Sequence, residues 1–146
     1  AVMAGCSAVP AANAPPVELP IVQSWSGDYP VAELKLLPEG QQQSGAGYLG
    51  SAAAFASIWA AFSPGEAVPT VNFRKQVVVF HRNVNFYNRT RIFKVTLKDG
   101  GAEVLATETM SAIPITDKVS MALAVVPRAG VKAIRSGTVR IPVRTE

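Results

Sequence analysis

Residues 76–82 read Gln-Val-Val-Val-Phe-His-Arg, and this stretch decides the fold. Its middle is β-branched or aromatic at every position, so both faces of an extended chain would be apolar there. A strand with one face in water would instead alternate apolar and polar residues. We therefore expect residues 76–82 to form a central strand of a sheet, covered on both faces.

The segment before this strand predicts one helix, over residues 51–62. Ser51 is a suitable N-cap, the alanines favour helix, and Ser63-Pro64-Gly65 ends it. Apolar residues recur at helical spacing, which gives the segment one apolar face. The residues of that face are Phe55, Ile58, Trp59 and Phe62. An aromatic stripe of this kind is expected to cover a sheet.

Further strands are predicted on both sides of these two elements. Upstream, Val31–Leu37 is the first credible strand between two prolines, and Glu39–Gly50 is expected to be a glycine-rich loop. Downstream, the expected strands are Arg89–Leu97, Glu103–Met110, Val119–Val126, the returning segment Val131–Ile134, and Thr138–Val143. In Arg89–Leu97, strict alternation puts Arg91, Phe93, Val95 and Leu97 on one face. In Val119–Val126, one face holds Met121, Leu123 and Val125.

These elements predict an α+β fold in a single domain. With 146 residues, 49% of them hydrophobic and 16% charged, the chain can bury one core. We expect one short amphipathic helix packed on a mostly antiparallel sheet of about six strands, or that sheet curled toward a barrel around the helix. The expected division is residues 1–6 as a signal remnant, 7–21 as a tether rich in proline and alanine, and 22–146 as the domain.

The N-terminal sequence Met3-Ala4-Gly5-Cys6 resembles a bacterial lipobox. In such signals an apolar residue and two small residues precede the cysteine, which becomes the acylated N-terminus. The resemblance implies a lipoprotein, anchored in the membrane through Cys6. Ser7 resembles the residue that sorts lipoproteins to the outer membrane, so we expect the cell envelope as the location.

From Gly45 to Val143 the order of features resembles the C-terminal domain of the protease-complex subunit PrcB family. The resemblance lies in a glycine-containing approach to a short helix, then the run Val68-Pro-Thr-Val-Asn-Phe-Arg-Lys-Gln-Val-Val-Val-Phe80, then hairpins. Family members usually carry Asp-Phe where this chain has Asn72-Phe73. The resemblance implies an accessory or assembly subunit, with no catalytic residues to carry over.

Catalytic chemistry has little support in the sequence. His81 and Cys6 are the only residues of their types, which excludes most protein-ligated metal sites. Acidic residues are dispersed, and Gly45–Gly50 lacks the partners of a phosphate-binding loop. We expect no enzyme and no cofactor, and a packed or hydrogen-bonded His81 in preference to a catalytic one.

Seven cations stand between Glu66 and Asp99 without one carboxylate. They are Arg74, Lys75, Arg82, Arg89, Arg91, Lys94 and Lys98. In an exported chain they could bind a lipid headgroup, a glycan or another anion, and we expect no nucleic acid. The residues expected to bind such an anion are Arg74, Lys75, Arg82, Arg91 and Lys94. The competing interpretation is that these cations protect strand edges from pairing with other chains.

The segment 83–90 joins two strands and carries three asparagines, two aromatics and an arginine. Exposed aromatics and arginine are typical of interface hot spots. The residues expected to contact a partner are Asn85, Phe86, Tyr87 and Arg89. A turn whose rings fold onto the core is the equal alternative. The first functional hypothesis is a non-catalytic envelope protein that binds a protein partner through a sheet edge and this segment; the alternative is an anion-binding module.

Overall fold

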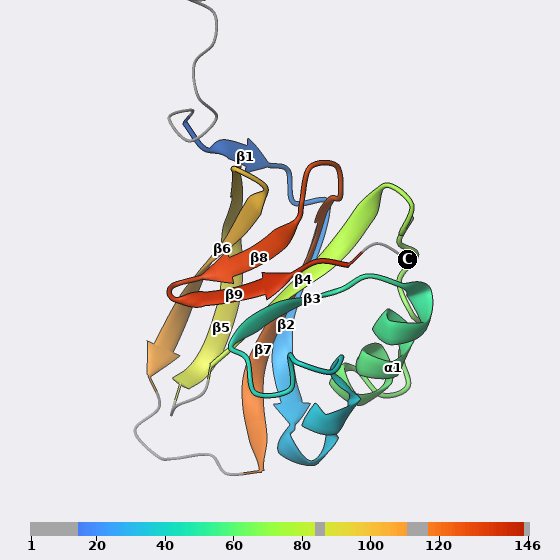
Figure 1. Cartoon of the computed structure of the whole chain (residues 1–146). Coiled ribbons are helices and arrows are strands. Elements are labelled where there is room, and N and C mark those ends of the chain that lie inside the picture. Colours follow the sequence, from blue (N-terminus) through green and yellow to red (C-terminus); the bar gives the residue numbers. More distant parts are fainter. Residues whose placement is uncertain (1–14, 84–86, 111–116, 145–146) are drawn as a thin grey trace, which may run out of the picture.

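Two β-sheets and one main helix form three layers in the computed structural model (Figure 1), which describes residues 15–83, 87–110 and 117–144. Sheet A has the strand order β1-β5-β6-β8-β9, and sheet B has the order β2-β7-β4-β3. In chain order the elements are β1 (Val17–Leu19), β2 (Gln23–Pro30), the 3-10 helix η3 (Val31–Leu36), β3 (Ala46–Leu49), α1 (Ala52–Phe62), β4 (Gln76–Arg82), β5 (Tyr87–Lys98), β6 (Gly101–Met110), β7 (Lys118–Pro127), β8 (Ala133–Ser136) and β9 (Val139–Pro142).

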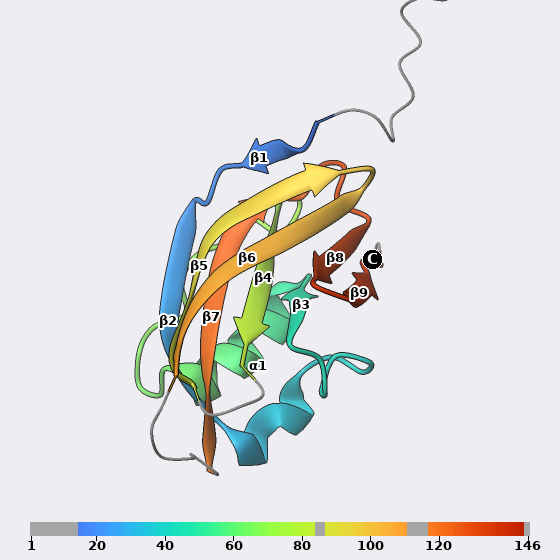
Figure 2. The ribbon, with the colours of Figure 1, turned by 90° about the vertical axis from the view of Figure 1, so that its left-hand side faces the viewer.

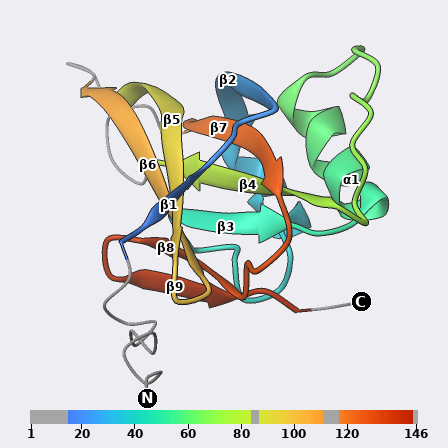
Figure 3. The ribbon, with the colours of Figure 1, turned by 90° about the horizontal axis from the view of Figure 1, so that it is seen from above.

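The α+β class and the mostly antiparallel pairing are confirmed. Among the described residues the one parallel pair of strands is β6 with β8. The described strands number nine, not about six, and they divide between two sheets. Figure 3 shows the layers from above, with β5 and β6 on one side, sheet B in the middle and α1 on the other side.

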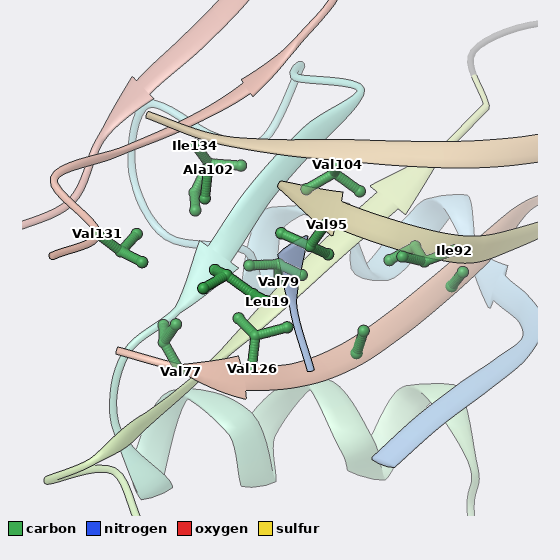
Figure 4. Close-up of a cluster of buried hydrophobic side chains, with 12 residues drawn as sticks. Leu19, Val77, Val79, Ile92, Val95, Ala102, Val104, Val126, Val131 and Ile134 are labelled. Carbon is green, nitrogen blue, oxygen red and sulfur yellow. The ribbon is translucent and has the colours of Figure 1, made fainter. Parts of the chain in front are cut away.

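The central position of residues 76–82 is confirmed, since β4 lies between β7 and β3. Val77 and Val79 face sheet A, whereas Val78 and Phe80 face α1. Strand β7 alternates in the same way. Met121, Leu123 and Val125 lie under the helix, as the sequence predicts, and Ala122, Ala124 and Val126 lie between the sheets. The core between the sheets is shown in Figure 4.

The predicted helix is confirmed as α1. The Ser51 hydroxyl accepts a hydrogen bond from the Ala54 N–H at 3.2 Å, which caps the first turn. Phe55, Ile58 and Trp59 are buried against sheet B. The Trp59 indole N–H donates to the Glu66 carbonyl at 3.2 Å and so holds the segment that leaves the helix.

Two predictions for residues 31–50 are wrong. The expected strand Val31–Leu37 is η3, in which no residue is buried, because Ala, Glu, Leu and Lys favour helical geometry and no sheet face is there to cover. The expected loop contains β3, whose residues Ala46–Leu49 pair with β4. Glycine suits position 47 of this strand because the Phe80 ring and the Gln41 side chain occupy the space that a Cβ atom would need.

The N-terminal boundary also differs from the prediction. Val17–Leu19 pairs with β5, and Leu19 is buried between the sheets, so the domain begins before residue 22. The next segment, β2, was not predicted as a strand. Its sequence Gln-Ser-Trp-Ser-Gly-Asp-Tyr-Pro is rich in residues that strands disfavour. Proline and glycine are tolerated there because β2 is an edge strand.

The predicted hairpin Arg89–Leu97 with Glu103–Met110 is confirmed as β5 and β6, but its faces are not strictly alternating. A register shift between Ile92 and Lys94 makes Phe93 an extra residue, so Ile92 and Val95 both point into the core and Phe93 is 52% exposed. Residues 131–134 do not return along β7. Instead β8 pairs with β6 and β9, because the turn after β7 carries the chain to the other sheet.

Candidate functional site

Among the described residues, the free edge of β2 is a candidate interaction site. Within the described part of the chain, β2 pairs only with β7. The Val31 N–H donates to the Asp117 carbonyl at 3.0 Å, and the register continues from there without a shift. In an antiparallel pair, every second residue of a strand forms backbone hydrogen bonds with the partner strand. The residues between them direct their N–H and C=O groups away from that partner. Trp25, Gly27 and Tyr29 therefore bond to β7, and the residues between them turn their backbone groups outward.

The outward residues are Ser24, Ser26 and Asp28, and all three are exposed. Their N–H and C=O groups form an open ladder along the edge. Their side chains lie on the face opposite to Tyr29, which is buried under the helix layer. An extended chain that adds to β2 would satisfy these backbone groups in the same way as a neighbouring strand.

A polar cavity of about 330 Å³ lies beside this edge on the side of sheet A. It is lined by Ser26, Gly27, Asp28, Arg89 and Ser120. The register places Ser120 of β7 opposite Asp28 of β2, and Ser120 is buried. Arg89 is exposed and comes from β5, which crosses over β2 and β7 at this point. The residues that line the cavity therefore include an arginine, an aspartate and two serines.

A more apolar cavity of about 250 Å³ lies on the helix side of the same edge. Its apolar lining comes from Pro30, from Ala61 and Phe62 of α1 and from Pro64 after the helix, and Asp117 and Lys118 line it as well. Asp28 lines both cavities, so the two lie on either side of one stretch of β2. Asp28 also pairs with Lys118 at 3.5 Å, and this is the only ion pair among the residues described. Because consecutive side chains of a strand point to opposite faces, neighbouring residues of an added strand would enter opposite cavities.

His81 lies near the polar cavity and faces the same inter-sheet space. Its Nδ1 is 3.3 Å from the Thr90 hydroxyl of β5. Burial lowers the pKa of His81, which favours the neutral imidazole. The geometry agrees with a hydrogen-bonded, packed histidine.

The cations predicted as one anion site belong to different elements in the two sheets. Arg82 is only 5% exposed, and its Nη2 donates to the Gln42 carbonyl at 2.8 Å. Burial lowers the pKa of this guanidinium, whose Nε has no hydrogen-bond partner among the described residues. Arg74 and Lys75 are exposed in the turn before β4. Arg91 and Lys94 belong to β5 in the other sheet. Cations that are close in the sequence lie in different sheets, because β4 belongs to sheet B and β5 belongs to sheet A.

The predicted partner-binding residues are described only in part. Asn85 and Phe86 lie outside the described residues, as does Cys6, and of Tyr87 the structure describes the backbone in β5. Arg89 lines the polar cavity. The prediction did not include Ser24, Ser26 and Asp28. Their signal was the alternation with Trp25, Gly27 and Tyr29 in a segment that lacks β-branched residues.

No protein-family model, no curated protein and no solved structure matches this chain. The resemblance to the PrcB family thus stays a prediction from sequence. In the part of the chain that is described, no helix has the length and apolarity to cross a membrane.

Proposed function

We propose that this chain is a non-catalytic accessory protein of the bacterial envelope, which binds an extended segment of a partner protein along the free edge of β2. Acylation of Cys6 would hold it at the membrane, in line with the lipobox-like sequence. One observation carries the binding proposal: the outward backbone groups of Ser24, Ser26 and Asp28 have no strand beside them in the described structure.

The backbone ladder supplies affinity. Each hydrogen bond that an added strand makes contributes a net free energy of about 0.5–1.5 kcal/mol. A few such bonds alone give weak binding, because association costs at least several kcal/mol. Side chains that fill the two flanking cavities would contribute the remainder and would select the partner.

The residues that line the two cavities support a particular chemistry for the proposed partner segment. Arg89 forms no ion pair within 4.0 Å in the described structure, so its guanidinium is free to bind a carboxylate from the partner. Phe62 and Ala61 on the other side favour an apolar side chain. In a strand, consecutive residues point to opposite faces. The proposed ligand is therefore an extended segment with an acidic residue directly next to an apolar one.

The test is selection of binding peptides from a random displayed library, with the full chain as bait. The selected peptides should carry an acidic residue adjacent to a β-branched or aromatic residue. Arg89→Glu should shift the selection from acidic to basic residues at that position, because it reverses the charge at the polar cavity. Arg74→Glu is the matched control, because it makes the same charge change in the turn before β4 and should leave the selection unchanged.

A second variant tests the backbone ladder. Ser26→Pro removes an outward N–H without removing a hydrogen bond to β7, so the domain should stay folded and lose peptide binding. Selection of peptides that bind Ser26→Pro as well as the unchanged protein would contradict strand addition. An identical selection with Arg89→Glu would contradict the role of the polar cavity.

A further inference from the structure

The outer face of sheet A carries a second feature, which is independent of the β2 edge. The inner face of this sheet packs against sheet B, whereas α1 and η3 lie on the far side of sheet B. Among the described elements none covers the outer face, which is turned toward the viewer in Figure 2. Its side chains follow from the register, because residues next to buried ones on a strand point the other way.

Cations predominate on this face. Ile92, Val95 and Leu97 point inward, and the residues between them point outward. The outward cations are Arg91, Lys94, Lys98, Arg135 and Arg140, and the outward carboxylates are Glu18 and Glu103. None of these cations forms an ion pair within 4.0 Å among the residues described. The face therefore has an excess of positive charge that the fold does not neutralise.

An aromatic ring stands in the middle of these charges. Phe93 is the extra residue at the bulge between Arg91 and Lys94, and 52% of it is exposed. A large apolar side chain flanked by cations is the composition with which peripheral proteins bind anionic membranes: the ring enters the interface and the cations contact headgroups. A soluble polyanion would make use of the charges but not of the ring.

The position of the first strand, β1, agrees with a membrane on the outer side of sheet A. Strand β1 lies at the edge of sheet A, next to β5, and the chain enters the domain there (Figure 2). We infer that the outer face of sheet A, through Phe93 and the cations around it, rests on a membrane surface that contains anionic phospholipid. The β2 edge, in the other sheet, then stays accessible to a partner.

The experiment is co-sedimentation of the full chain, as Cys6→Ser so that no acyl anchor contributes, with vesicles of phosphatidylcholine and of equal parts phosphatidylcholine and phosphatidylglycerol. We expect binding only to the anionic vesicles, and weaker binding at higher salt. One cation near such a surface strengthens binding about fivefold, so Arg91→Glu/Lys94→Glu should weaken it by at least about 25-fold. Phe93→Ser should also weaken binding, with its salt dependence retained.

The matched control is Arg74→Glu/Lys75→Glu, which makes the same change in net charge at the exposed turn before β4. It should bind anionic vesicles nearly as well as the unchanged chain. Equal losses in both double variants would mean that only net charge matters, and would overturn the proposal. Absence of vesicle binding would overturn it as well, and binding to heparin without vesicle binding would assign the face to a soluble polyanion. The altered side chains of β5 and of the turn before β4 are exposed or half-buried. Circular dichroism checks that each variant is folded.

Discussion

Gly47→Ala should destabilise the domain strongly, although alanine has no difficulty with the backbone conformation of this strand. A Cβ at Gly47 would lie 2.0 Å from the Gln41 side-chain oxygen and 2.7 Å from the Phe80 ring. That oxygen accepts the Tyr48 N–H at 2.7 Å, and Gln41 is buried. Overpacking costs about 1–3 kcal/mol, and a buried hydrogen bond that is lost costs a similar amount. The free energy of unfolding should fall by about 2–6 kcal/mol.

The assay is urea unfolding followed by tryptophan fluorescence, since Trp25 and Trp59 pack against each other over sheet B. Gly45→Ala is the control from the same segment, because its Cβ would meet only the Arg82 carbonyl oxygen, at 3.5 Å. The control should change the free energy of unfolding by less than about 1 kcal/mol. If both variants unfold at the same urea concentration as the unchanged protein, the close packing of β3 on Phe80 is refuted.

Two further predictions concern buried or bridging polar groups. Burial lowers the pKa of His81, the only histidine, so the unfolded chain takes up a proton more readily. The free energy of unfolding should therefore be greatest above pH 6.5 and fall as the pH drops through the lowered pKa, and His81→Gln should remove this slope. Urea midpoints between pH 7.5 and 5.5 measure this slope, and an unchanged slope in His81→Gln would refute the prediction. The Arg128 guanidinium donates to the carbonyls of Gly50 and Phe73. Arg128→Met should cost about 2–3 kcal/mol by the same assay, against little for Arg91→Met on the surface, and equal effects would contradict the bridging role.

The sequence was sufficient to predict those helices and strands whose pattern of apolar residues follows directly from burial. The helix over residues 52–62 and the strands β4 and β7 are apolar on the faces that the two cores cover, so their patterns predicted both type and location. The hairpin of β5 and β6 was predicted from alternation and from its glycine turn. Its bulge was not, because one extra residue leaves no separate signal in an alternating pattern.

The candidate site could be predicted only in part, for a physical reason. An edge strand such as β2 needs one apolar face, and it tolerates serine, glycine and proline where its backbone is free. These residues are also typical of loops, so propensity pointed away from a strand. The assembly of Arg89 with Asp28 and Ser120 depends on how β5 crosses sheet B, which is a tertiary property that spacing in the sequence does not contain.

The cations that were predicted as one anion site lie in different layers, and this arrangement is also a tertiary property that sequence spacing does not contain. Arg74, Lys75 and Arg82 flank or end β4 in sheet B, whereas Arg91, Lys94 and Lys98 follow β5 in sheet A. A run of like charges in the sequence stays together only when its segments stay in one layer. Here the chain changes layer between β4 and β5, and the outer face of sheet A instead gains Arg135 and Arg140 from strands near the C-terminus.

Amide hydrogen exchange along β2, measured for the free protein and with a selected peptide bound, tests strand addition most directly. In the free protein we predict slow exchange at Trp25, Gly27 and Tyr29, which bond to β7, and fast exchange at Ser24, Ser26 and Asp28. Bound peptide should slow exchange at the second set and leave the first set unchanged. Slow exchange at all six positions in the free protein, or no change in the second set when peptide is bound, would contradict the proposal that β2 is an open edge that binds a partner.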